Sequence, residues 1–187
     1  MNILLVDLDD TLINTTSLKE FFFKDLANKS HTSVAEMYSK YSESKIIAIN
    51  SDWMEAFSKI LQDSYSITFN DYMQSLEQGL SLIQTNEQVL NLVRSFNGNK
   101  VLFSLGNEKI QLVKINHFHL KSLFDDILIT HQPKFEIFSL HMKDSEFIHH
   151  NISYNKVTII DDDVTLIEKI KLQFPWVETI LTQTLLQ

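Results

Sequence analysis

The sequence has no cysteine, only three glycines and two prolines, and no long hydrophobic run. Without cysteine there can be no disulfide, no thiolate metal site and no cysteine nucleophile. The apolar runs are far shorter than the ~18 residues that a membrane-spanning helix needs, and the first residues, MNILLVDLDD, lack the basic segment of a signal peptide. We therefore expect a cytoplasmic protein that does not act in a membrane.

Basic residues are also scarce, with 16 Lys plus Arg against 24 Asp plus Glu and a formal net charge of -8. Nucleic acids and anionic membranes are usually bound through a basic surface, so the charge argues against both as partners. The 187 residues, 44% of them hydrophobic, suit one domain with a sizeable insertion. A monomer and a homodimer both fit this composition.

The few glycines and prolines lie mostly in the second half of the chain, which leaves a long first stretch almost free of them. No proline precedes Pro133, and Gly79 is the single glycine before Gly98. A stretch without these residues, rich in Leu, Lys, Glu, Ser and Met, is typical of helices. Five helices are predicted there, over 17–27, 33–42, 52–62, 70–83 and 87–96, with Ser17, Asn70 and Asn86 as candidate caps.

Short apolar runs alternate with helical patterns in the rest of the chain. Such runs are typical of strands buried on both faces, and their alternation with helices indicates a parallel sheet. The predicted strands are 3–6, 101–105, 127–130, 157–160 and 177–181, and the predicted helices are 108–118, 135–141 and 164–172. The fold class is therefore α/β, a Rossmann-like parallel sheet with helices on both faces.

A long segment, residues 13–97, separates the first strand from the second. A structureless loop of this length would be unusual in a compact domain, so we predict an inserted all-helical subdomain. The sheet-bearing core would then consist of residues 1–12 and 98–187.

Polar residues and one glycine follow the predicted strands, at the sheet edge where parallel α/β proteins bind ligands. They are Asp7, Asp9, Asp10, Thr11, Ser104, Gly106, Asn107, Gln132, Lys134, Asp161, Asp162 and Asp163. Crowded carboxylates need a cation, and oxygen ligands suit Mg2+. A carboxylate can also attack phosphorus, while a lysine and a hydroxyl hold the phosphoryl oxygens. For residues 161–163, simple helix capping is an open alternative.

Four motifs resemble those of the haloacid dehalogenase (HAD) superfamily, in the same order. Residues 3–12 (ILLVDLDDTL) resemble its first motif, an apolar strand followed by Asp-x-Asp-x-Thr-Leu. Residues 102–104 resemble the second motif, Lys134 the third and residues 159–162 the fourth. In that family an insertion between the first two motifs is a helical cap, which implies this role for residues 13–97.

The resemblance also implies roles for individual residues. Asp7 would be the nucleophile and Asp9 the general acid and base. Mg2+ would be bound by the Asp7 carboxylate, the Asp9 carbonyl and Asp162, with Asp161 or Asp163 in support. The candidates for phosphate binding are Thr11, Ser104, Asn107 and Lys134, of which Ser104 and Lys134 would also act in catalysis and Thr11 would order the loop.

A carboxylate at Asp9 distinguishes phosphatases of this family from its dehalogenases. The resemblance therefore implies a Mg2+-dependent phosphatase acting on a small phosphate ester, and sugar phosphates, glycolate-like phosphates and nucleoside monophosphates all fit. Two points stay open: whether Lys134 or Gln132 takes the third-motif position, and whether Asp161 or Asp162 is the inner metal ligand.

Two rival hypotheses concern the function. One is a non-catalytic HAD-like binding or regulatory module, which the unusual order Gln132-Pro133-Lys134 would support. The other is a phosphoacceptor receiver domain, which is disfavoured because receivers have no large helical insertion after the first strand.

Six of the seven histidines lie between His117 and His150, which raises the possibility of a zinc site. The pairs 117/119 and 149/150 lack the i, i+4 spacing of helical zinc ligands. The sequence therefore favours surface or packing histidines.

Overall fold

The computed structural model describes residues 1–47 and 53–182. It separates into two compact units, one formed by residues 1–14 together with the chain from residue 85 onward, and the other by residues 15–84. No helix in the described part of the chain has the length and apolar character needed to cross a bilayer.

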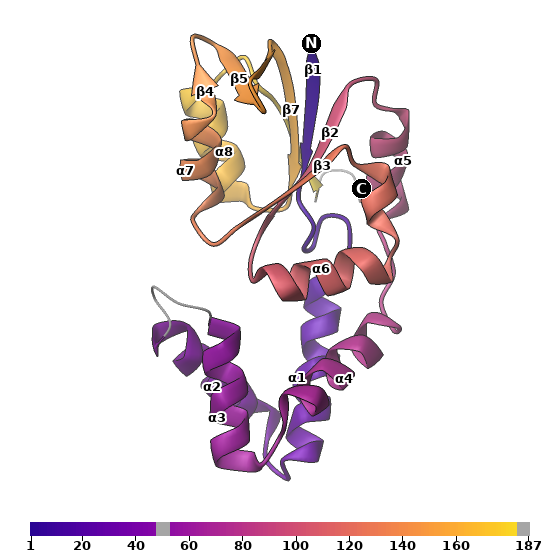
Figure 1. Ribbon diagram of the computed structural model, residues 1–187, viewed down its shortest axis with the longest axis vertical. Coiled ribbons are helices and arrows are strands. Elements are labelled where there is room, and N and C mark those ends of the chain that lie inside the picture. The colour runs from indigo at the N-terminus through magenta and orange to yellow at the C-terminus, as the bar shows by residue number, and fades with distance from the viewer. Residues whose placement is uncertain (48–52, 183–187) are drawn as a thin grey trace. The chain divides into compact units, whose positions relative to one another are not determined.

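The first unit has a five-stranded parallel sheet in the order β3-β2-β1-β7-β8 (Figure 1). Its strands are β1 (Asn2–Val6), β2 (Asn99–Leu105), β3 (Asp126–Thr130), β7 (Lys156–Asp161) and β8 (Glu178–Leu181). Its helices are α5 (Glu87–Ser95), α6 (Glu108–His117), α7 (Lys134–Leu140) and α8 (Val164–Gln173), with a short 3-10 helix over Leu120–Leu123. The predicted α/β class and all five predicted strands are confirmed.

Helices cover both faces of this sheet because its strands are apolar on both sides. On one face, Ile3 and Leu5 belong to a core cluster with Phe138 of α7 and Ile167 of α8. The alternate residues of β1 point to the other face, and α5 lies on that side, opposite α7 and α8 (Figure 1). Because both faces of the strands are packed against helices, the polar residues that follow the strands are held in fixed positions.

A second, antiparallel sheet was not predicted. It comprises β4 (Met142–Lys143), β5 (Glu146–His149) and β6 (Ile152–Tyr154). Its strands are too short to show a clear alternation, and both hairpin turns reach positive φ without glycine, at residues 144–145 and 150–151. Asp, Asn, Ser and His take that conformation less often than glycine does, so the usual hairpin signal is missing from the sequence.

The helical unit is shorter than the predicted insertion of residues 13–97. Helix α5 belongs to the sheet-bearing unit instead. The backbone N–H of Asn86 donates to the carbonyl of Leu12 at 2.8 Å, and Asn86 also caps α5. The buried residues of this helix are Val89, Leu90 and Val93. The helical unit is therefore residues 15–84 rather than 13–97, and the remaining residues form the sheet-bearing unit.

The helical unit contains α1 (Thr15–Lys29), α2 (Val34–Ile47), α3 (Trp53–Tyr65) and α4 (Phe69–Leu80). An aromatic cluster that includes Phe22, Phe23, Phe57 and Tyr72 packs between these helices. Gly79 lets α4 approach α1 closely, since a Cβ there would lie 2.7 Å from the Leu18 Cδ1 atom.

Two predicted helix starts in this unit differ from the structure, and a third cannot be placed. The cap of α4 is Thr68, which forms a reciprocal capping box with Asp71, so Asn70 is not the cap. Helix α1 begins at Thr15, which places Ser17 inside its first turn. The predicted start at Asp52 lies outside the described residues.

One polar contact that joins α2 to α3 predicts a pH-dependent stability. The Tyr65 hydroxyl donates to Glu36 Oε1, and this hydrogen bond raises the pKa of Tyr65 to about 12. A group with a raised pKa stabilises the fold fully below its unfolded value, ~10 for tyrosine, and this contribution is lost as the pH rises through about 12. We expect Glu36→Gln to move the Tyr65 transition toward pH ~10 in a titration of phenolate absorbance, with Tyr65→Phe identifying the signal. An unchanged transition would show that Glu36 does not cause the shift.

Candidate active site

The candidate site begins where β1 and β7 end side by side. Val6 is in register with Ile160, and the Asp7 N–H donates to the Ile160 carbonyl at 2.9 Å. Asp7 and Asp161 therefore leave neighbouring strands together. From β1 the chain proceeds to β2 and β3 on one side and later to β7 and β8 on the other. Such a switch point is where open parallel sheets bind ligands.

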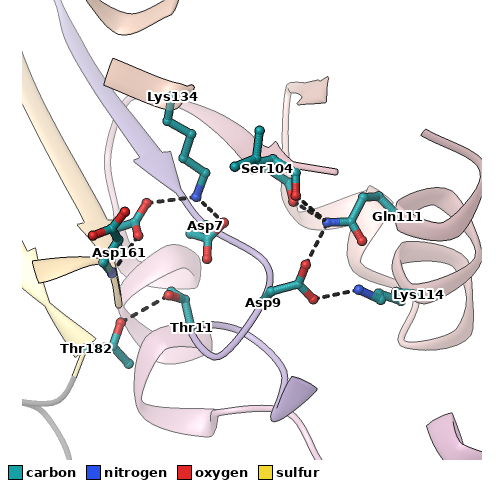
Figure 2. Close-up of polar contacts among 11 residues, drawn as sticks. Asp7, Asp9, Thr11, Ser104, Gln111, Lys114, Lys134, Asp161 and Thr182 are labelled. Carbon is teal, nitrogen blue, oxygen red and sulfur yellow. Dashed lines mark hydrogen bonds and ion pairs between the residues drawn. The ribbon is translucent and has the colours of Figure 1, made fainter. Parts of the chain in front are cut away.

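Lys134 brings a positive charge to these two acids. It is the first residue of α7, its side chain is 9% exposed, and its Nζ atom bridges Asp7 Oδ1 and Asp161 Oδ2, the latter at 2.8 Å (Figure 2). Gln132 is exposed, and its backbone bonds to the Thr130 hydroxyl. Of the two candidates for the third-motif position, Lys134 thus reaches the acids.

The carboxylates outnumber the cation in this cluster. Burial raises the pKa of Asp7 well above its ordinary value, with Lys134 opposing and Asp161 and Asp9 adding to the rise. Burial also raises the pKa of Asp162, and the charge of Asp161 adds to it. Burial lowers the pKa of Lys134, but Asp7 and Asp161 raise it by more, so the net shift is upward. The site therefore has excess negative charge for a further cation to offset.

The donor atoms suit a hard divalent cation. Asp7, Asp161 and Asp162 each offer a carboxylate oxygen, and these oxygens all lie within 4.8 Å of one another. A donor set made only of oxygens fits Mg2+ better than Zn2+. Asp163 lies just outside this cluster and caps α8, since its Oδ1 accepts from the N–H groups of Thr165 and Leu166.

Asp9 lies apart from the cluster and is held by α6. Its Oδ1 pairs with Lys114 Nζ at 2.7 Å, and its Oδ2 accepts from Gln111 Nε2 at 2.7 Å. In Figure 2 the Asp9 carboxylate is directed toward Gln111 and Lys114 rather than toward Asp7. The site thus has two parts, a cluster around Lys134 and a separate acid fixed by α6.

Gln111 connects Asp9 to the end of β2. Its Nε2 also donates to Ser104 Oγ at 2.7 Å, while its Oε1 is buried and has no partner among the described residues. The carboxylate of Asp9 fixes the orientation of the Gln111 amide. In the flipped orientation the amide oxygen would face the carboxylate, and both of these groups are hydrogen-bond acceptors.

Sequence reasoning missed both Gln111 and Lys114. Each is almost fully buried, at 2% and 6% exposure, and their i, i+3 spacing places them on one face of α6. The available signal was a glutamine and a lysine close behind the second motif, on the helix that begins directly after Asn107.

Two of the residues predicted to bind phosphate, Asn107 and Thr11, have local hydrogen-bond partners. The Asn107 side-chain oxygen caps α6 by accepting from the Ile110 N–H at 3.1 Å. Thr11 is buried, and its hydroxyl accepts from the Thr182 hydroxyl at 3.2 Å, which ties the first-motif loop to the end of β8 (Figure 2).

No protein-family model matches the sequence, and no curated protein matches it. Solved structures do match. A haloacid dehalogenase-like hydrolase from Burkholderia xenovorans has a TM-score of 0.73 and 16% identity, over 96% of this chain and 81% of the other. A HAD phosphatase from Thermococcus onnurineus has a TM-score of 0.59 and 15% identity, over 99% and 96%. The magnesium-bound HAD-hydrolase YfnB from Bacillus subtilis has a TM-score of 0.59 and 17% identity, over 95% and 85%.

These similarities place the chain in a class of proteins defined by fold. It has the Rossmann-like fold of HAD-like hydrolases, with a helical segment inserted between the first and second strands of the sheet. The fold implied by the sequence motifs is thereby confirmed.

The buried lysine predicts how stability responds to Mg2+. Lys134→Met would leave Asp7 and Asp161 without their cation, and breaking a buried pair in this way costs about 3–5 kcal/mol. We expect urea unfolding with a chelator to show that loss, and Mg2+ to recover part of it by supplying positive charge.

The matched control is Lys109→Met, since Lys109 is exposed on α6 and its loss should change stability by about 0.5 kcal/mol or less. Equal losses in the two variants would show that Lys134 does not neutralise the cluster.

Proposed function

We propose that the chain is a HAD-superfamily phosphatase, a Mg2+-dependent hydrolase of a phosphate monoester of a small metabolite. The observation that carries the proposal is the position of Asp7 at the switch point of the sheet, with Lys134 bound to one of its oxygens. The solved structures of similar fold, one described as a phosphatase, support the same class.

Asp7 acts as the nucleophile in this proposal. Lys134 binds its Oδ1 and orients the carboxylate, so that Oδ2 attacks the phosphorus of the ester. The bond from phosphorus to the ester oxygen breaks, and the alcohol leaves with a proton from Asp9. Asp9 then takes a proton from water, which attacks the aspartyl-phosphate and releases phosphate and the Asp7 carboxylate.

The contacts of Asp9 affect its part in this sequence. Both of its oxygens are engaged, one by Gln111 and the other by Lys114. To donate a proton to the leaving group, Asp9 has to exchange at least one of these bonds. Lys114 and Gln111 are thus positioning residues for the acid and base, while Ser104 and Lys134 contact the phosphoryl oxygens.

Mg2+ bound here would offset negative charge on the phosphoryl group and hold it against the protein. We assign its ligands to Asp7, Asp162 and the carbonyl of Asp9. Asp161 supports them, because its two oxygens already accept from Lys134 and from the Asp163 N–H. The magnesium-bound hydrolase of similar fold is consistent with this assignment.

We further propose that residues 15–84 act as the cap that selects the substrate, as the insertion does in the family that the motifs resemble. Sugar phosphates, glycolate-like phosphates and nucleoside monophosphates remain the substrate classes to test. The proposal needs no nucleic acid or membrane partner, and it holds for a monomer or a homodimer in the cytoplasm.

The first test of the proposal is hydrolysis of an aryl phosphate in the presence of Mg2+. We expect turnover that Asp7→Asn abolishes and a chelator removes, because the amide is a poor nucleophile and the cluster then lacks a cation. Asp63→Asn makes the same chemical change at an exposed position of α3 and should leave the rate unchanged. No turnover across a broad panel of phosphate esters would favour the non-catalytic binding module.

The second test addresses the role of Asp9. An alkyl alcohol is a poor leaving group and needs a proton, whereas an aryl oxide leaves with little assistance. We expect Asp9→Asn to lower kcat/KM for an alkyl phosphate by ~10²–10⁴-fold, the usual contribution of general acid catalysis, and for an aryl phosphate by much less. Equal losses for both substrates would exclude Asp9 as the general acid.

A further inference from the structure

The β5–β6 hairpin presents two adjacent histidines on the same side. His149 ends β5 and pairs with Ile152 of β6, so that His150 and Asn151 form a two-residue turn. Both turn residues have positive φ, at 49° and 62°. Neighbouring residues in a strand normally point to opposite faces, but the left-handed turn brings the two rings together, with centroids 4.2 Å apart.

A carboxylate from the main sheet faces both rings. The Oδ2 atom of Asp126, the first residue of β3, lies 2.8 Å from His149 Nε2 and 2.9 Å from His150 Nε2. The three donor atoms all lie within 4.8 Å of one another. The local spacing of the histidines does not reveal this arrangement, because Asp126 meets the hairpin only through folding.

The donor set differs from that of the active site. Two imidazole nitrogens and one carboxylate oxygen are typical ligands of Zn2+ and related transition metals, whereas Mg2+ prefers oxygen. Without a metal, each Nε2–H donates to the same carboxylate oxygen. A divalent cation would take the place of these two protons, with each neutral imidazole moving its proton to Nδ1.

The two histidines differ in their exposure to solvent. The side chain of His149 is 5% exposed and lies against the Phe147 ring, while that of His150 is 71% exposed. A buried ligand fixes the position of a metal, and an exposed one gives it a path from solvent and leaves room for water to complete the coordination.

We propose that Asp126, His149 and His150 form a binding site for a Zn2+-type transition-metal ion that braces the hairpin against the main sheet. The site lies at the amino end of β3, whereas the candidate active site lies at the carboxyl ends of the strands. The bound ion is structural, so it stabilises the fold and leaves the phosphatase chemistry unchanged. The proposal is therefore independent of the proposed function.

The test is titration of the full chain with Zn2+ by calorimetry, in the presence of excess Mg2+ to occupy the carboxylate cluster. We expect one equivalent to bind and the melting temperature to rise. His150→Ala removes an exposed ligand without opening the core. It should weaken binding by at least about tenfold, since even residues that only support a metal ligand contribute about 10- to 100-fold. Co2+ in place of Zn2+ should give visible absorption, and His150→Ala should require a higher Co2+ concentration to reach it.

Two further variants complete the test. His117→Ala removes an exposed histidine of α6 and should leave Zn2+ binding intact. Asp126→Asn, a near-isosteric change, should weaken Zn2+ binding as His150→Ala does. The proposal is overturned if no saturable binding occurs, or if binding is the same in His150→Ala and the unaltered chain.

Discussion

The bridge from Lys134 to Asp7 and Asp161 is the contact on which the candidate site depends. An ammonium and two carboxylates are removed from water together, and each alone would cost several kcal/mol to bury. The bridge also joins three elements, since Lys134 begins α7, Asp7 directly follows β1 and Asp161 ends β7. One side chain thus sets both the electrostatics of the site and the position of a helix.

The remaining acids divide between two environments. Asp162 adds a third carboxylate to the buried cluster, which makes that part of the site suited to a cation. Asp9 is held instead by Lys114 and Gln111 of α6. Two aspartates only two residues apart in the sequence therefore have different partners.

The sequence predicted the sheet well because buried parallel strands are marked by short, continuous apolar runs. Apolar runs such as residues 3–6 have few alternative structures, and the polar residues that follow them must lie at the sheet edge. The β4-β5-β6 sheet was missed for the opposite reason, since its short strands owe their pairing to hairpins closed by residues other than glycine. The cap of α4 was misplaced because asparagine and threonine both cap helices, and Thr68 lies just two residues before Asn70.

The sequence by itself determined the fold class, the order of the motifs and the acids that end the strands, since all of these follow from residues close together in the chain. Only the tertiary structure decided that Lys134 rather than Gln132 meets Asp7, and that Gln111 binds Asp9, across separations of 127 and 102 residues. It also brought Asp126 to the histidines of the β5–β6 hairpin. Such contacts depend on how helices and strands pack, and on side-chain reach across that packing, neither of which a local pattern encodes.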